Sequence, residues 1–312
     1  MPKVGLARRV RNWYRDPRPD VMPALRQALS RECKIARPIY ELAKYTVQVA
    51  ANKRPWMQRL IGKKAEVDFA TYLQIYDRTT ATFVPYKDQL TRVADLLDIS
   101  GGETVVDLGA GTGNLTLQVK QRGAEVYSID SSPEANAIHR EKNPDARILE
   151  VNIDRPDNIL GFLPFEDNSV DRVCGANLWT YIRNRETLYA EIRRILRPDG
   201  IFVLAVEKEG YDTTAIFSAH RSMVYQNYLN LGYMPLTAAV ATFAKVFANL
   251  GDLLIAADQS KKLVSGMAAG EYATFNELGI ARELSQARFV PRITDPDAYA
   301  GQVIITKNTP QG

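Results

Sequence analysis

Three alternating glycines between two acidic residues form the segment of the chain best suited to bind a ligand. Gly109, Gly111 and Gly113 follow an apolar run, and a helical pattern begins immediately after them. Glycine lets the backbone turn sharply and approach a ligand closely, and a helix start presents free backbone N–H groups. Asp107 precedes the first glycine by two residues, and Asp130 follows the next apolar run. A carboxylate there can accept hydrogen bonds from ribose hydroxyls, so the pattern predicts a nucleoside cofactor.

The glycine spacing separates two classes of nucleoside cofactor. Dinucleotide sites typically have the pattern G-x-G-x-x-G, whereas this chain has G-x-G-x-G with an acid before the first glycine. An acid at that place suits a cofactor with a cationic amino-acid tail better than it suits a pyrophosphate. The residues therefore favour S-adenosylmethionine (SAM) over NAD.

Four motifs in this order resemble those of the class I SAM-dependent methyltransferases, over about residues 100–207. The glycine-rich motif is Asp107–Gly113, and Asp130–Glu134 is similar to the family's ribose-binding acid and helix start. Leu163–Asp171 resembles the segment that enters the fourth strand, and Arg194–Gly200 resembles the turn before the fifth. The resemblance is greatest to the broad group with quinone and sterol methyltransferases, and it implies methyl transfer from SAM on a Rossmann-like fold.

The resemblance assigns cofactor contacts to residues on several segments. It places the glycine motif against the methionine part of SAM, Asp130 on the ribose and Ser131 beside the adenine. Asn152 stands where many relatives have an acid that contacts the adenine amino group, although a loop-capping role is an equal alternative. The full expected cofactor set is Asp107, Gly109, Gly111, Thr112, Gly113, Asp130, Ser131, Asn152, Ile153, Asn177, Leu178 and Tyr76.

Methyl transfer asks the protein mainly to exclude water and align the acceptor, because the leaving group is already activated. A general base is needed only where the acceptor must lose a proton early. The candidate catalytic residues are His220, Glu207 and Tyr181, which follow the fourth and fifth strand-like runs. Packing in the interior is the competing interpretation for His220 and Tyr181.

The elements that must position these residues can be read from the hydrophobic pattern. Short β-branched runs alternate with helical patterns, which predicts parallel βαβ units. Strands are expected at 104–108, 125–129, 147–151, 170–176 and 201–206, with helices at 114–122 and 186–196 and a closing hairpin of 289–294 and 302–306. The expected fold is α/β, a Rossmann-like seven-stranded sheet with helices on both faces. The expected units are a basic helical N-terminal arm or cap (1–98), the SAM-binding core (99–208), a helical lid inserted after the fifth strand (209–269), and a C-terminal helix with the closing hairpin (270–312).

The charge of the chain is distributed unevenly. Residues 1–66 carry 16 Lys and Arg against 5 Asp and Glu, whereas the whole chain has a net charge of only +4. A basic arm on a mildly acidic body predicts an anionic partner for the arm. Its arginines border an apolar stripe with Trp13, which is typical of a helix in a membrane interface. Docking of the arm on the enzyme's own core and binding to nucleic acid are the alternatives.

The composition of the chain is that of a globular protein and gives no sign of a metal site, a secretory signal or a membrane span. Apolar residues make up 46% of the chain and charged residues 24%, which is typical of a globular protein. Two distant cysteines and two histidines do not form a metal-ligand pattern, so no metal site is expected. We find no secretory signal, and the longest uncharged stretch, 222–244, is interrupted by polar residues and a proline. These features predict a cytoplasmic protein, with contact at the membrane surface as an extension.

Three functions remain open at this stage. The first is methyl transfer to an apolar small molecule or lipid-like acceptor, favoured by the nearly uncharged insertion, which would line a pocket. The second is methylation of RNA adenine, with the basic arm holding phosphates. Adenine methyltransferases carry a proline-containing motif after the fourth strand, where this chain has Asn177-Leu-Trp-Thr180, so nucleic acid is the less favoured partner. The third is a non-catalytic subunit with the same fold. The acceptor atom and the oligomeric state are not readable from the sequence.

Overall fold

The computed structural model describes residues 69–154, 160–209, 213–248, 262–263, 265–295 and 301–308. The first 68 residues of the predicted arm lie outside the described residues, as do 249–261 of the predicted insertion. The membrane or phosphate contact assigned to the arm therefore stays a prediction, and so does the division into four units.

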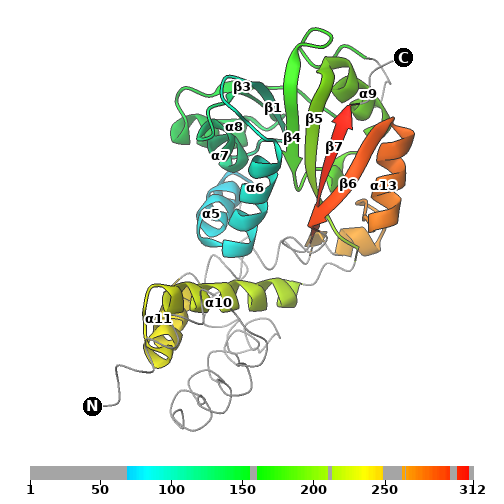
Figure 1. Ribbon diagram of the computed structural model, residues 1–312. Helices are drawn as coiled ribbons and strands as arrows, with labels where there is room; N and C mark the ends of the chain where they lie inside the picture. The colour runs from blue at the N-terminus through cyan, green and yellow to red at the C-terminus, as the bar shows by residue number, and fades with distance from the viewer. Residues whose placement is uncertain are drawn as a thin grey trace.

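A seven-stranded sheet forms the centre of the molecule, in the order β3-β2-β1-β4-β5-β7-β6 (Figure 1). Strands β1 to β5 pair in parallel, and β7 runs antiparallel between β5 and β6. The strand order reverses between β1 and β4, where open α/β sheets place their ligands at the carboxyl ends of the strands. The predicted Rossmann-like architecture is confirmed. The strands are β1 (Thr104–Leu108), β2 (Glu125–Ile129), β3 (Arg147–Leu149), β4 (Val170–Ala176), β5 (Leu196–Glu207), β6 (Phe289–Asp295) and β7 (Gly301–Asn308).

Helices cover both faces of the sheet because successive strand residues point to opposite sides. Val105 of β1 packs in an apolar cluster with Leu90 of α6 and Val119 of α7. Its neighbour Val106 packs in the other cluster, with Ile192 of α9. The helices are α5 (Phe69–Thr82), α6 (Val84–Leu96), α7 (Asn114–Lys120), α8 (Pro133–Lys142), α9 (Arg185–Ile195), α10 (Thr213–Asn230), α11 (Pro235–Ala248) and α13 (Glu277–Gln286), with a 3₁₀ turn η1 (Trp179–Tyr181).

Local sequence signals fix where several helices begin. Helix α8 starts with Ser132 as its N-cap, and the Ser132 hydroxyl accepts a hydrogen bond from the Ala135 N–H while Pro133 occupies the first turn. The Asn184 side chain caps α9 in the same way, accepting from the Thr187 N–H. Both caps satisfy backbone donors that the helix itself leaves unpaired.

The strands differ from the predicted ranges mainly at the start of β5. The sequence predicts a turn at 198–200 followed by a strand from residue 201, whereas β5 already begins at Leu196. Leu196 pairs with Val170, and the register shifts before Ile201 pairs with Arg172. The turn residues are thus absorbed into an irregularity of the strand, which a hydrophobic pattern does not reveal.

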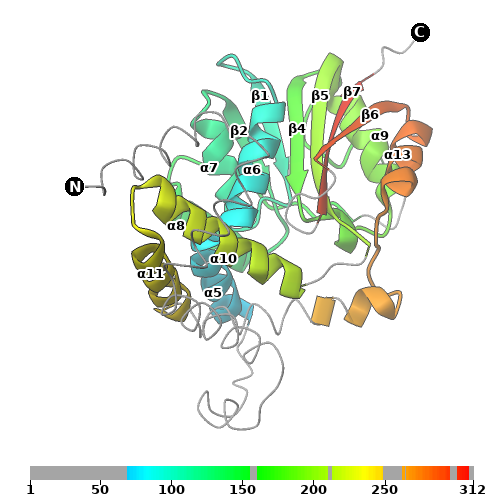
Figure 2. The same cartoon turned by 60° about the horizontal axis from the view of Figure 1, so that its bottom comes forward.

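Two helical pairs flank the carboxyl ends of the strands. Helices α5 and α6 lead into β1, and α10 and α11 follow β5. Figures 1 and 2 show α10 and α11 on the side of the sheet where α5 also lies. Within the described residues, the helices are too short or too polar to cross a bilayer.

Candidate cofactor and acceptor site

The glycine loop after β1 has the backbone conformation that its sequence predicts. Gly109, Gly111 and Gly113 all have positive φ, at 63°, 53° and 82°. A Cβ at Gly109 would lie 2.7 Å from the Leu178 side chain, and one at Gly113 would lie 2.3 Å from the His139 ring. A Cβ at Gly111 would meet only the Gly109 carbonyl oxygen, at 4.0 Å. The loop is therefore closed by protein at its two ends and open at its centre.

Asp130 joins the open centre of the loop to the end of β2. One carboxylate oxygen accepts the Gly111 N–H at 2.8 Å, and the other accepts the Ser132 N–H at 2.8 Å. Each oxygen keeps a further lone pair for a ligand. The partly exposed carboxylate beside the open face of Gly111 fits the ribose of a nucleoside. The residues present thus fit the cofactor that the sequence predicts.

Asp107 lies in the interior rather than on the surface of the site, with an exposed fraction of 1%. Its carboxylate accepts a hydrogen bond from the Thr116 hydroxyl at 2.6 Å and from the Cys174 thiol at 3.8 Å. Burial raises the pKa of the Asp107 carboxyl to about 7, against the opposing effect of the Thr116 hydrogen bond. Asp107 therefore connects β1 to α7 and β4, and its carboxyl ionises at a higher pH than an exposed aspartate does.

A polar cluster, the Asp77 latch, fastens α5 to the glycine loop. The Asp77 carboxylate accepts hydrogen bonds from the Thr112 hydroxyl at 2.7 Å and from the Lys142 ammonium at 2.6 Å. Lys142 also donates to the Asn114 side-chain oxygen at 2.6 Å. The latch consists of Asp77, Thr112, Asn114 and Lys142, and it joins three helices that are distant in sequence. The sequence named only Thr112 of this set, because no spacing rule links the other three.

Tyr76, the residue predicted on α5, lies next to the latch. Its ring meets the ring of Tyr86 edge to face, with centroids 6.2 Å apart. Burial raises the pKa of Tyr86, while hydrogen bonding to Tyr76 and Asn114 acts in the opposite direction. The structure thus brings Tyr76 to the same end of the sheet as the glycine loop.

Of the remaining predicted cofactor residues, two follow β4 and three follow β2 or β3. Leu178 touches Gly109, and the Asn177 amide donates to the Gln89 side chain at 2.9 Å, so β4 ends beside the loop. Ile153 is buried in the apolar core, whereas Ser131 and Asn152 are exposed. The Asn152 side chain accepts the Asp154 N–H at 3.0 Å, which is the loop-capping geometry.

Thr180 of η1 links two of the three candidate catalytic residues, since it bonds to Glu207 at the end of β5 and precedes Tyr181. Glu207 is 6% exposed and accepts a hydrogen bond from the Thr180 hydroxyl at 2.9 Å. Burial raises the pKa of the Glu207 carboxyl above its usual value. Tyr181, the residue after Thr180 in η1, is half exposed, and its ring meets the ring of Tyr272 edge to face at 5.4 Å. The buried Glu207 carboxyl is therefore bonded to the residue that precedes the exposed Tyr181 phenol.

His220 lies apart from that pair, on α10. Its Nδ1 accepts the Val84 N–H at 3.2 Å, and its ring stacks on Phe83 with centroids 4.5 Å apart. Burial, followed by the charge of Lys245, lowers the pKa of His220 to about 4. The ring is therefore neutral at pH 7 with its proton on Nε2, and it ties α10 to α6.

A second polar network, which we call the Glu191 knot, is centred on α9, on the face of the sheet opposite α6 and α7. It explains why two of the sequence motifs occur in the same chain. The Glu191 carboxylate accepts the N–H groups of Gly161 and Leu163 at 2.8 and 3.0 Å. Arg194 donates to Glu191 at 2.7 Å and to the carbonyl oxygens of Leu163 and Phe165. The motifs around residues 163–171 and 194–200 are thus joined by structural hydrogen bonds.

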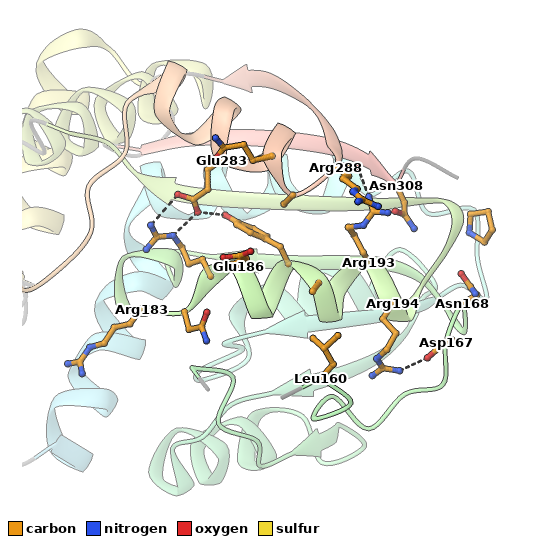
Figure 3. Close-up of a pocket in the computed structure, with 17 residues that line it drawn as sticks. Leu160, Asp167, Asn168, Arg183, Glu186, Arg193, Arg194, Glu283, Arg288 and Asn308 are labelled. Carbon is orange, nitrogen blue, oxygen red and sulfur yellow. Dashed lines mark hydrogen bonds and ion pairs between the residues drawn. The ribbon is translucent and has the colours of Figure 1, made fainter. Parts of the chain in front are cut away.

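A groove of about 1130 Å³ runs over the knot between α9 and α13 (Figure 3). Four of the eight charged side chains that line it form ion pairs, Arg185 with Glu283 and Arg194 with Asp167. None of the predicted cofactor or catalytic residues lines it. Among the described residues, no group of three acidic, histidine or cysteine side chains is placed to hold a metal ion.

Comparison with known proteins agrees with this geometry. Residues 106–204 match the family model described as a methyltransferase domain. An uncharacterized methyltransferase of Mycobacterium tuberculosis is 30% identical over 134 residues, which is 43% of this chain and 49% of that protein. A demethylmenaquinone methyltransferase of Clavibacter sepedonicus is 29% identical over 203 residues, 64% of this chain and 78% of that one.

A solved SAM-dependent methyltransferase from Aquifex aeolicus covers 76% of this chain and 97% of its own, at 15% identity and a TM-score of 0.45. The chain spans about half the length of the mycobacterial relatives it matches. The glycine loop, Asp130 and the switch point between β1 and β4 all lie inside the matched range. Residues 106–204 therefore form a class I SAM-dependent methyltransferase domain.

Proposed function

We propose that the protein transfers a methyl group from SAM to an apolar small-molecule acceptor. The observation that carries the proposal is the open centre of the glycine loop, where Gly111 faces no side chain and Asp130 keeps free lone pairs beside it. When bound, SAM supplies a methyl group on an activated leaving group. The chain's own residues then need to hold the nucleoside, align the acceptor and exclude water.

The cofactor end of the site divides these tasks among its residues. Asp130 binds the ribose hydroxyls while its bonds to Gly111 and Ser132 hold it in one orientation. Leu178 fills the space beside Gly109 and so closes the site at the end of β4. Asp107, buried beneath the loop, joins β1 to α7 and β4 and so holds the floor of the site together.

The end of β5 and the turn η1 supply the acceptor side. Glu207 accepts from Thr180 and has a raised pKa, which suits a carboxyl that takes a proton from an acidic acceptor. Tyr181 and Tyr272 offer a half-exposed aromatic pair against which a flat ring can pack. His220 keeps its Nε2 proton and serves as a donor or as a packing residue rather than as a base.

The named relatives support a quinone-like acceptor. Several are demethylmenaquinone methyltransferases, including the Clavibacter protein and one from Tropheryma whipplei that is 31% identical over 138 residues. The RNA alternative gains no support from the described residues. Trp179, which stands where RNA enzymes carry a proline-shaped clamp, is fully buried and donates to the Tyr189 hydroxyl at 2.8 Å.

The test is a transfer assay with methyl-labelled SAM and a host-cell extract, separated afterwards into organic, aqueous and nucleic-acid fractions. Asp130→Ala serves as the inactive variant. Glu125→Ala is the matched control, because Glu125 is an exposed acid at the other end of the same strand. Label in the organic fraction that disappears with Asp130→Ala supports the proposal. Label in RNA, or label that survives Asp130→Ala, contradicts it.

The assignment of Glu207 and Tyr181 has its own test. Glu207→Gln is expected to lower kcat with little change in the KM for SAM, because it removes the proton acceptor but keeps the Thr180 hydrogen bond. Tyr181→Phe is expected to act mainly on the KM for the acceptor. If both variants leave both parameters unchanged, neither residue contacts the acceptor.

A further inference from the structure

The connection between α10 and α11 gathers apolar side chains on the surface of the protein. Five of the nine large apolar side chains that stand exposed among the described residues lie within ten positions of one another. Their exposed fractions reach 73% for Leu231 and 67% for Met234. We call this set the hairpin tip, and it consists of Leu231, Tyr233, Met234, Leu236 and Val240.

The tip is exposed although the hairpin behind it is packed. Val224 of α10 and Ala238 and Thr242 of α11 are buried. At the inner end, Ile216 joins the core cluster of α6, and His220 is held between Phe83 and the Val84 N–H. The exposed side chains are therefore presented by a fixed pair of helices and not by a loose segment.

The charge of the hairpin is unusual for a surface element. Residues 213–248 contain no aspartate or glutamate, and their only charged side chains at neutral pH are Arg221 and Lys245. On α11, Leu236 and Val240 lie one turn apart and share a face with the exposed Ala244. The apolar tip is thus followed by cations toward the anchored end of the hairpin, with no acids, an order that is complementary to negative headgroups above hydrocarbon.

The tip lies well away from the point where α10 is anchored to α6. Ten residues of α10 separate the anchored His220 from Leu231, which corresponds to about 16 Å along the helix axis. Figure 1 shows both helices beyond the sheet, at the end where α5 also lies. The centroids of the Tyr228 and Tyr233 rings lie 5.2 Å apart near the turn between α10 and α11. Tyrosines are enriched at membrane–water interfaces.

We propose that the hairpin tip inserts into the interfacial layer of a lipid bilayer that carries negative headgroups. A protein partner fits less well, because a stable protein interface engages roughly 20–30 residues a side and the tip offers five. A second copy fits less well too, because it would bring two acid-free, cationic hairpins together. The inference stands apart from methyl transfer, although it would place the carboxyl ends of the strands toward a reservoir of apolar acceptors.

The experiment is co-sedimentation of the full chain with vesicles, without SAM or acceptor. One set contains phosphatidylcholine alone, and the other also contains phosphatidylglycerol. Wild type is expected to pellet with the mixed vesicles, and Leu231→Ser combined with Met234→Ser is expected to weaken binding at least about tenfold. The matched control is Leu278→Ser combined with Val290→Ser, which alters two side chains that are 82% and 59% exposed on α13 and β6.

A second variant tests the charge. Lys245→Gln is expected to weaken binding to the mixed vesicles about fivefold and to leave binding to phosphatidylcholine alone unchanged. The proposal is overturned if the tip variant binds vesicles as wild type does, or if the control variant loses binding equally. It is also overturned if the tip variant binds vesicles as before and differs from wild type only in its mass by light scattering. The exposed surface would then join two copies of the chain. Circular dichroism confirms that each variant is folded.

Discussion

The Asp130 region and the Glu191 knot are both dense in motif residues and in charged hydrogen bonds, yet only in the first is the central carboxylate accessible to a ligand. In the knot, the Glu191 carboxylate receives two backbone N–H groups and Arg194, and Glu191 is fully buried. At the glycine loop, Asp130 is also held by two backbone N–H groups but stays partly exposed beside the uncovered Gly111. The hydrogen bonds to the two carboxylates are alike, and the difference lies in whether the carboxylate itself is exposed.

This comparison separates two reasons for a motif. The residues near 163 and 194 are needed together because a buried carboxylate and guanidinium must satisfy each other and the loop carbonyls. The glycines are needed because backbone and ligand must approach closely. Substitutions should therefore affect stability in the knot and cofactor affinity at the loop, and the following predictions test that division.

The largest effect is expected in the knot. Glu191→Ala leaves Arg194 and two backbone N–H groups without their buried acceptor, which should lower the free energy of unfolding by roughly 3–5 kcal/mol. Urea unfolding measures this loss, and calorimetry at low temperature should find the affinity for SAM within about twofold of wild type. Glu125→Ala, which breaks an exposed ion pair with Arg147, should cost about 1 kcal/mol or less. A large loss of affinity in folded Glu191→Ala would erase the distinction.

Asp130→Ala should show the opposite pattern. Removing charged hydrogen bonds to the ribose is expected to weaken SAM binding about 100-fold or more, with a small change in unfolding free energy because the carboxylate is partly exposed. Isothermal calorimetry measures the affinity directly. Wild-type affinity in this variant would remove Asp130 from the cofactor site and with it the main support for the proposed function.

A smaller effect is expected at the Asp77 latch. Asp77→Asn should weaken SAM binding about fivefold and make α5 more accessible to protease, because Lys142 loses its charged partner while Thr112 keeps an acceptor. Lys142→Met should have a similar effect, and the double variant should be less than additive. Fully additive losses would show that the latch does not act as a unit.

The last prediction concerns pH. The unfolded Asp107 carboxyl titrates near its ordinary 3.8 and the folded one at about 7. Between these values the folded state holds a proton that the unfolded state has lost, so this group makes stability fall as pH rises. His139 and His220 act in the opposite sense, since burial lowers the pKa of each to about 4 from 6.5.

Asp107→Asn isolates the first effect. The difference in unfolding free energy between this variant and wild type should grow in favour of the variant by at least ~1 kcal/mol from pH 4 to pH 7. Thermal unfolding across this range measures it. A constant difference would place the Asp107 carboxyl in contact with water.

The predicted strands at 104–108, 125–129 and 170–176 agree with β1, β2 and β4. Those runs are short, β-branched and bounded by glycine or helix caps, so local sequence defines them. The start of β5 was missed because its register shift depends on pairing with Val170 and Arg172. The Asp77 latch was missed for a similar reason, since it joins three helices whose contacts leave no periodic signal.

The amino-acid sequence by itself determined the order of strands and helices, the positive-φ loop and the acid at the end of β2, because these follow from hydrophobic period and from backbone freedom at glycine. Tertiary structure alone decided which charged groups face solvent. It buried Asp107, closed Glu191 against Arg194, turned Nδ1 of His220 to a backbone N–H and left the tip of α10 and α11 uncovered. Burial depends on neighbours that are distant in the chain, and a side chain's type does not record which neighbours it will meet.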